Sequence, residues 1–93
     1  MDIRALTQSY AVSPQVAPED FATIRAAGFV TVINNRPDAE IPPHLHTDPM
    51  RQAAEAAGLT YIVNPVIGGA ITEDNVATQR QTIEQSPGPV FAY

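Results

Sequence analysis

A helix end, a glycine and the start of a strand follow one another twice in this sequence. The two copies are Ala26-Ala27-Gly28-Phe29-Val30 and Ala56-Ala57-Gly58-Leu59-Thr60. Glycine is common just after a helix end, and β-branched and aromatic residues are favoured in strands. Consecutive helix-to-strand units are typical of right-handed parallel βαβ connections. The sequence therefore predicts the α/β fold class, with a small, mostly parallel sheet flanked by helices.

Uncharged apolar runs mark the strands of this sheet. They cover residues 29–33, 59–63 and 89–93, and a shorter candidate lies at Tyr10-Ala11-Val12. Runs without charge are expected in parallel strands that are covered on both faces. We therefore predict that neighbouring strands bury Val32, Ile33, Ile62, Val63, Val90 and Phe91.

Three helices are predicted from their start and stop signals. The first covers residues 18–27, with Pro18 in its first turn and Phe21, Ile24 and Ala27 on one face. Thr47 or Asp48 caps the second, whose apolar stripe is Met50, Ala53, Ala54 and Ala57. Thr72 caps the third, which is largely solvent-facing and turns Val76, Ala77 and Ile83 inward. Between the first two helices, Asn34 to Glu40 is predicted to be a polar loop and Ile41-Pro42-Pro43 an extended, non-helical segment.

The length and composition fit one soluble domain over residues 1–93. The chain is 44% hydrophobic and 16% charged, with no apolar run near the ~20 residues that a membrane span requires. Its start lacks a basic segment leading into an apolar one, so we expect no secretory signal. With no cysteine, the expected compartment is the cytoplasm.

The charge balance limits the partners. The net charge is −5, and the basic residues are Arg4, Arg25, Arg36, Arg51 and Arg80. So few basic groups argue against nucleic acid and anionic membranes as partners. Arginine can still hold one oxyanion in fork geometry, so a small anionic ligand is the expected partner.

The segment Asn34-Asn35-Arg36-Pro37-Asp38 follows a predicted buried strand at its carboxyl end. Ligands of open α/β sheets gather beyond this end of the strands, so Arg36 or Asp38 could reach one. The alternative is a plain turn, in which Asn and Asp bond their own backbone and Pro fixes it.

Other polar motifs favour structural roles. His44, His46 and Asp48 resemble half of a zinc site, but the chain has no further His and no Cys, so no metal or cofactor is predicted. Gly68-Gly69 lacks the Lys-Ser/Thr of a phosphate-binding P-loop and is predicted to be a turn. Glu73 and Asp74 suit the amino end of the third helix.

Several segments taken together resemble one bacterial family, the domain of unknown function 442. They are Ala11-Val12-Ser13-Pro14-Gln15, Ala26-Ala27-Gly28-Phe29, Val32-Ile33-Asn34-Asn35-Arg36-Pro37-Asp38, Ala56-Ala57-Gly58-Leu59, Pro65-Val66, Gly69-Ala70-Ile71-Thr72 and Pro87-Gly88-Pro89-Val90. The family is related to dual-specificity protein tyrosine phosphatases and is the amino-terminal domain of beta-lactamase hydrolase-like proteins. The resemblance implies a tyrosine phosphatase-like fold.

In that family, the strand that corresponds to Val90–Tyr93 is followed by Cys-x-x-Gly-x-x-Arg, which binds phosphate and supplies the thiolate nucleophile. This sequence ends at Tyr93, so the resemblance implies the amino-terminal portion of a phosphatase-like domain, incomplete at its carboxyl end. It places Arg36, Pro37, Asp38 and Tyr93 at the rim of the substrate pocket.

The general acid is not assigned by the resemblance. In related phosphatases, an Asp in the loop after the third strand protonates the leaving group. The corresponding stretch, residues 64–71, contains no carboxylate here. Asp38, or alternatively Glu40, is the candidate replacement.

Three functions remain open at this point. The first is hydrolysis of phosphate esters through a cysteine loop that follows Tyr93. The second is rhodanese-like sulfur transfer through a persulfide on the same cysteine, and the third is a non-catalytic binding or structural module. Since residues 1–93 contain no Cys, we expect this chain to be inactive as written. Self-association or fusion to a metallo-β-lactamase-like domain is the expected assembly.

Overall fold

A computed structural model describes residues 3–7 and 9–93. The strands are β1 (Arg4–Thr7), β2 (Tyr10–Val12), β3 (Thr31–Asn34), β4 (Thr60–Val63) and β5 (Val90–Ala92). The α-helices are α1 (Asp20–Ala26), α2 (Thr47–Ala56) and α3 (Glu73–Gln85), and short 3₁₀ helices span Asp38–Glu40, Pro43–Leu45 and Ile67–Gly69.

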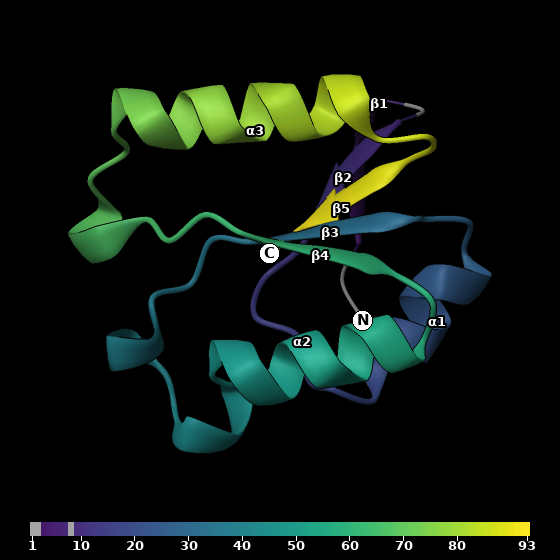
Figure 1. Ribbon diagram of the computed structural model, residues 1–93, viewed down its shortest axis with the longest axis horizontal. Helices are drawn as coiled ribbons and strands as arrows, with labels where there is room; N and C mark the ends of the chain where they lie inside the picture. The colour runs from purple at the N-terminus through teal and green to yellow at the C-terminus, as the bar shows by residue number, and fades with distance from the viewer. Residues whose placement is uncertain (1–2, 8) are drawn as a thin grey trace.

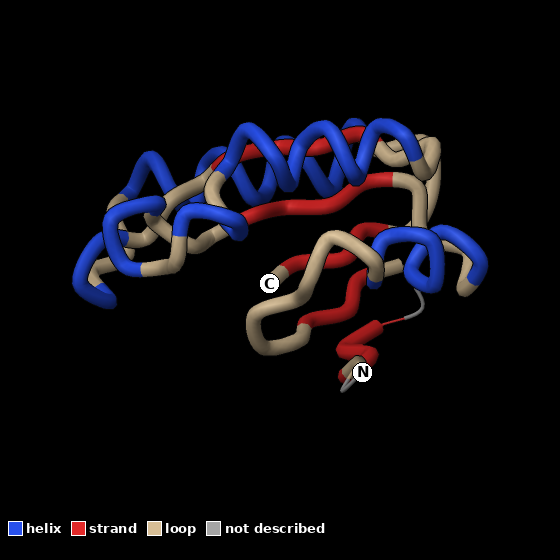
Figure 2. Tube along the Cα trace, turned by 90° about the horizontal axis from the view of Figure 1, so that it is seen from below, coloured by secondary structure: helices blue, strands red, loops and turns tan. Residues whose placement is uncertain are grey.

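The strands form one sheet in the order β1-β2-β5-β3-β4. β2, β5, β3 and β4 run parallel to their neighbours, whereas β1 pairs antiparallel with β2 at one edge. Figure 2 shows the C-terminus in the middle of the sheet and β1 near its border. The predicted α/β class and mostly parallel sheet are confirmed. The sequence analysis did not predict β1, because this short strand is exposed along its whole length and has no alternating pattern.

Helices cover both faces of the sheet. Figure 1 shows α3 on one side of the strands and α1 and α2 on the other. The larger core cluster contains Phe21 and Ile24 of α1, Met50 of α2, and Val32 and Phe91 of the sheet. The smaller cluster, of Ile33, Val90 and Ala92 with Ile83 of α3 packed against it, lies on the α3 side.

Burial in the inner strands matches the prediction, whereas burial at the edge is lower. Val32, Ile33, Val90 and Phe91 are at most 1% exposed, as predicted. Ile62 and Val63 are only half-buried. Their strand, β4, is an edge strand with one neighbour, so the prediction of full burial is wrong there.

Several predicted boundaries also shift. α1 begins at Asp20 rather than residue 18, and the Asp20 carboxylate accepts a hydrogen bond from Ala17 N at 2.9 Å, which closes the turn before the helix. Ala27 is exposed. Asn34 is the fully buried last residue of β3 rather than a loop residue. Pro43 opens a 3₁₀ helix, since proline fits a first helical position, whereas Ile41 and Pro42 are extended as predicted.

α3 is well capped and weakly buried. Thr72 Oγ1 accepts a hydrogen bond from Asn75 N, and the Asn75 side chain accepts one from Thr72 N, so the predicted cap is confirmed as a capping box. Val76 is 47% exposed and Ala77 is also exposed, so the prediction that they turn inward is wrong. Within the described residues, no helix combines the length and apolar character needed to span a membrane.

We predict that Ile33→Asp strongly destabilises the fold. The side chain is fully buried, and the new carboxylate would lie without a partner beside Val90 and Ala92. We expect the free energy of unfolding to fall by at least about 3 kcal/mol, measured by urea denaturation. The matched control is Ile67→Asp, where the side chain is 69% exposed and the expected change is within about 0.5 kcal/mol. Equal midpoints for the two variants would contradict the assignment of Ile33 to the core.

Candidate functional site

A pocket of about 370 Å³ lies at the carboxyl ends of the parallel strands. The loop after β3, the loop after β4 and the end of β5 all contribute to it. Its lining residues are Asn35, Arg36, Pro37, Glu40, Val66, Gly69 and Tyr93. The structure therefore brings together Arg36, Pro37 and Tyr93, three of the four residues that the sequence analysis placed at a substrate pocket.

Backbone hydrogen bonds extend the sheet into this pocket and fix its walls. Tyr93 N donates to Ile33 O at 3.0 Å, and Asn35 N donates to Tyr93 O at 2.9 Å. Val66 N donates to Asn35 O at 2.9 Å. Asn35 thus holds both neighbouring segments through its main chain. Sequence reasoning did not assign Asn35, Val66 or Gly69 to the pocket, because main-chain pairing beyond a strand end leaves no side-chain signal.

Arg36 stands on a turn that the preceding strand organises. The Asn34 side-chain oxygen accepts a hydrogen bond from Arg36 N at 2.8 Å, which is the Asx-turn pattern expected for Asn at such a position. Pro37 is buried, whereas Arg36 itself is exposed. The segment is therefore a turn, and this turn presents the guanidinium group at the pocket. The interpretation as a plain turn and the interpretation as part of a ligand pocket are therefore compatible.

Asp38 and Glu40 belong to the same 3₁₀ helix but contact different elements. Asp38 Oδ1 accepts hydrogen bonds from Thr47 N at 2.8 Å and from Thr47 Oγ1 at 2.9 Å, so it caps α2. The predicted cap by Thr47 or Asp48 is wrong, since Asp38 supplies the oxygen. Glu40 Oε2 accepts a hydrogen bond from Gly68 N at 3.1 Å and lines the pocket. Among the described lining residues, Glu40 is the carboxylate and Asp38 is absent.

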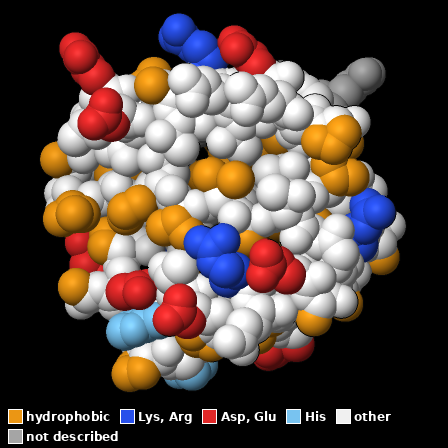
Figure 3. Space-filling model, viewed as in Figure 1, with side chains coloured by type: hydrophobic (Ala, Val, Ile, Leu, Met, Phe, Trp, Pro, Cys, Tyr) orange, Lys and Arg blue, Asp and Glu red, His pale blue; other side chains and the backbone are white. Residues whose placement is uncertain are grey.

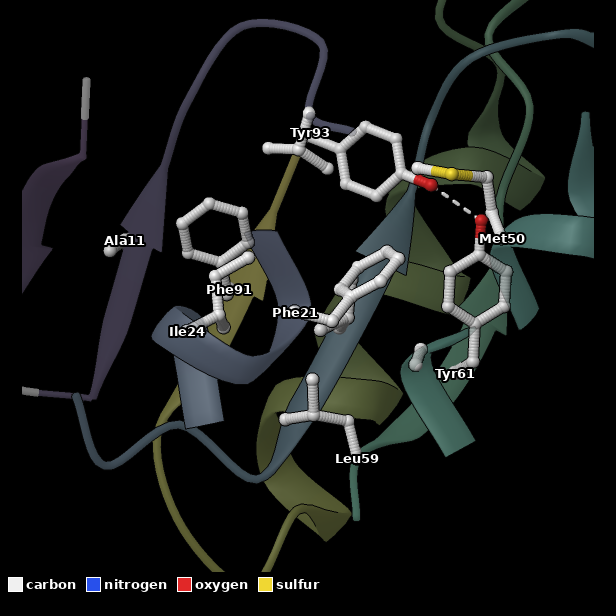
Figure 4. Packing of buried hydrophobic residues seen from close by; sticks show 11 residues of the cluster. Ala11, Phe21, Ile24, Met50, Leu59, Tyr61, Phe91 and Tyr93 are labelled. Atoms are coloured by element: carbon white, nitrogen blue, oxygen red, sulfur yellow. Dashed lines mark hydrogen bonds between the residues drawn. The ribbon is translucent and has the colours of Figure 1, made fainter. Parts of the chain in front are cut away.

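Tyr93 anchors the end of β5 through its hydroxyl group. Its hydroxyl shares a hydrogen bond with that of Tyr61 at 2.5 Å, drawn as a dashed line in Figure 4. The Phe21 ring packs edge-on against the Tyr61 ring, with the centroids 6.2 Å apart, and the Arg51 guanidinium group lies over the same Tyr61 ring, 5.4 Å from its centroid. Burial raises the pKa of Tyr93, and its hydrogen bond to Tyr61 raises this pKa further. Burial likewise raises the pKa of Tyr61. Both hydroxyl groups are therefore protonated at neutral pH.

The remaining motifs that the sequence analysis considered take part in local hydrogen bonds and turns. His46 Nε2 makes a hydrogen bond with Ile41 O at 2.9 Å. Across the described residues, no group of three or more His, Cys, Asp or Glu side chains is placed to hold a metal. Gly68 and Gly69 have positive φ angles of 59° and 74°, as their predicted role in a turn requires.

A second, larger groove of about 660 Å³ lies beside α3. Its apolar wall includes Val66, Ile71, Val76 and Ile83. Figure 3 shows hydrophobic side chains at the surface in the hollowed band beneath this helix. Asn35 lines both this groove and the smaller pocket, so the two hollows adjoin at the end of β3.

Comparison with known families gives a match over residues 2–93 to "Beta-lactamase hydrolase-like protein, phosphatase-like domain". The chain belongs to this phosphatase-like family. The phosphatase-like domain is 40% identical over 80 residues to a beta-lactamase hydrolase-like protein of Agrobacterium fabrum, and 33% identical over 93 residues to one of Xylella fastidiosa. These matches cover 86% and 100% of the chain, but only 18% and 22% of the two relatives. The chain thus spans about a fifth of the length of these curated relatives.

Solved structures share the fold of the phosphatase-like domain. A candidate phosphatase from Neisseria meningitidis superposes with a TM-score of 0.83 at 36% identity, which covers 100% of this chain and 66% of that one. A candidate phosphatase from Shewanella putrefaciens, of domain family 442, gives 0.80 at 21% identity, with 97% and 58% covered. TpbA from Pseudomonas aeruginosa, in complex with pTyr, gives 0.66 at 16% identity, with 97% and 51% covered. The family and the phosphatase-like fold predicted from the sequence are therefore confirmed.

We predict that Tyr93→Phe makes the fold less sensitive to alkaline pH. In the unfolded chain Tyr93 ionises near pH 10, whereas in the folded chain its pKa is raised above that value. Above about pH 10 the unfolded state thus binds fewer protons, and the free energy of unfolding falls as pH rises. Urea denaturation between pH 9 and 12 should show a slope that is shallower in the variant, by up to about 1.4 kcal/mol per pH unit. Identical slopes would contradict a buried, neutral Tyr93.

We also predict that Asp38→Ala destabilises the domain by about 1–2 kcal/mol, as expected for the loss of a helix cap. The Asp38→Asn variant keeps an oxygen that can accept the Thr47 hydrogen bonds and should lose less than half as much. Urea denaturation of both variants measures this difference. A loss of the same size for both would mean that the negative charge, rather than the cap, matters.

Proposed function

We propose that the pocket at the end of β3 and β5 binds the phosphoryl group of a phosphate ester. The domain would then be the amino-terminal part of a hydrolase whose cysteine loop follows Tyr93. The observation that carries this proposal is that Arg36 and Tyr93 line one pocket, at the strand ends where ligands of α/β sheets gather. Membership of a phosphatase-like family over residues 2–93 supports it.

Each rim residue has a distinct role in this proposal. The Arg36 guanidinium group donates paired hydrogen bonds to phosphoryl oxygens, which arginine does better than lysine because of its planar fork. Tyr93 fixes the strand end from which the phosphate-binding loop departs, through its main-chain bonds to β3 and its hydroxyl bond to Tyr61. Buried Pro37 holds the turn that carries Arg36.

Sulfur transfer uses the same pocket differently. A rhodanese-like enzyme would carry a persulfide on the loop cysteine, and its small anionic substrate would also meet Arg36. A non-catalytic module would bind an anion without turnover. Activity measurements separate these alternatives. A phosphatase releases phosphate, a sulfurtransferase transfers sulfur, and a non-catalytic module does neither.

Anion binding gives the first test, in a longer form with the family's Cys-x-x-Gly-x-x-Arg loop after Tyr93. We predict that Arg36→Ala weakens phosphate or sulfate binding about tenfold or more, as expected for loss of a charge-assisted hydrogen bond. Calorimetric titration measures binding, and urea denaturation measures stability. Arg4→Ala, on the exposed edge strand β1, removes the same charge and serves as the control. If Arg36→Ala reduces stability as much as it reduces binding, the residue only forms the turn.

Turnover gives the second test. We predict that the longer form hydrolyses an aryl phosphate, whereas the 93-residue chain does not, because it contains no thiolate to act as the nucleophile. Each form is assayed on the aryl phosphate and on thiosulfate with cyanide, with a Cys→Ser version of the longer form as control. Thiosulfate-to-cyanide transfer without phosphate release would replace the phosphatase assignment with the sulfurtransferase one. Activity that survives Cys→Ser would refute both.

A further inference from the structure

The resemblance to tyrosine phosphatases implies a proton donor in the loop after β4, and residues 64–71 contain no Asp or Glu. The structure brings a carboxylate to this loop from elsewhere. Glu40, in the 3₁₀ helix after β3, reaches across to accept a hydrogen bond from Gly68 N at 3.1 Å. We infer that Glu40 is the general acid of the phosphatase reaction, supplied by the loop after β3 of the same chain. This inference rests on the proposed function.

The position of Glu40 satisfies the geometric requirement for a proton donor. Its side chain lines the same pocket as Arg36 and Tyr93, and it is the carboxylate among the described residues of that lining. An acid that protonates the leaving oxygen must stand beside the phosphoryl-binding group without replacing it. Glu40 meets this condition because it lines the pocket itself, and the Gly68 amide holds one of its carboxylate oxygens next to Gly69, another lining residue.

Asp38, the other candidate from the sequence, is committed elsewhere. Its Oδ1 accepts hydrogen bonds from both the main-chain nitrogen and the hydroxyl group of Thr47, at the start of α2. Asp38 is also absent from the pocket lining, to which Glu40 belongs. Glu40 is exposed, lines the pocket, and accepts its hydrogen bond from the loop after β4 that forms part of the pocket lining. The contacts therefore favour Glu40 over Asp38.

The proposed step balances as an ordinary two-stage hydrolysis. The thiolate of the cysteine loop attacks phosphorus, so a sulfur–phosphorus bond forms while the bond from phosphorus to the ester oxygen breaks. The leaving oxygen takes the electron pair of that bond and the proton of the Glu40 carboxyl group. In the second stage, the Glu40 carboxylate accepts a proton from water, the water oxygen attacks phosphorus, and the thiolate leaves. Phosphate and an alcohol are the products, and no redox change occurs.

The test uses the longer form, in which the cysteine loop follows Tyr93, and substrates that differ in their need for an acid. p-Nitrophenyl phosphate has a leaving group that departs readily as an anion, whereas phenyl phosphate needs protonation. Glu40→Gln keeps an oxygen that can accept the Gly68 hydrogen bond but loses the transferable proton. Glu40→Ala loses both. Glu55→Gln, on the exposed face of α2, is the control for loss of one negative charge.

We predict that Glu40→Gln lowers kcat for phenyl phosphate by at least about 100-fold, and lowers kcat for p-nitrophenyl phosphate by about tenfold or less. Glu55→Gln should change neither kcat. If Glu40 had a purely structural role, its substitution would lower kcat equally for the two substrates. The Glu40→Gln variant would then retain more activity than Glu40→Ala.

The inference and the proposed function fail in different ways. A wild-type longer form without cysteine-dependent phosphatase activity overturns both. If the wild type is active but Glu40→Gln has equal or negligible effects on the two substrates, the general acid is not Glu40 and the proposed function stands. The same conclusion follows if Asp38→Asn, rather than Glu40→Gln, shows the dependence on the leaving group.

Discussion

The insertion of β5 between β2 and β3 is the constraint on which the structure depends. The last strand of the chain pairs with both neighbours, so it joins the β1–β2 pair to the β3–β4 pair. Without it, the sheet would fall into two separate pairs. Its residues Val90, Phe91 and Ala92 serve both core clusters, one on each face of the sheet. Folding of this domain therefore requires long-range pairing of the chain's last strand with much earlier ones, which is slow to form because the intervening loop must close first.

The same insertion creates the candidate site. Parallel strands end at one edge, and β5 ends beside β3, so Tyr93 and the Arg36 turn face a common pocket. A hydrogen bond between the hydroxyl groups of Tyr93 and Tyr61 links this edge of the pocket to the core beneath it, where Phe21 packs against both tyrosine rings. The pocket thus lies above buried, hydrogen-bonded aromatic residues, whereas its charged residues Arg36 and Glu40 are exposed in the segment between β3 and α2. Such a division is typical of α/β proteins, whose scaffold and site residues come from different parts of the chain.

Local sequence signals predicted the elements well, because the information lay within a few residues. The Ala-Ala-Gly segments marked two helix ends, and Thr72 marked the start of α3. Long-range contacts were not predictable in the same way. Thr47 looked like a cap from its own position, yet its main-chain nitrogen is bound by Asp38 from an earlier loop. Ile62 lies in an uncharged run typical of a strand covered on both faces, but its strand is at the sheet edge. The order of strands in a sheet cannot be read from the local sequence pattern. The weak burial of α3 was predicted from its polar middle, whereas the exposure of Val76 and Ala77 depends on what packs beside the helix and was not.

The two carboxylates of one short 3₁₀ helix show how little sequence distance separates a helix-capping residue from a pocket-lining one. A 3₁₀ helix has about three residues per turn, so side chains two positions apart point roughly 120° away from each other. Asp38 and Glu40 are related in this way, and they accordingly reach different neighbours, the start of α2 and the loop after β4. Exchanging their roles would require the helix to rotate, which buried Pro37 at its amino end opposes. The turn that holds Arg36 therefore also determines which carboxylate faces the pocket.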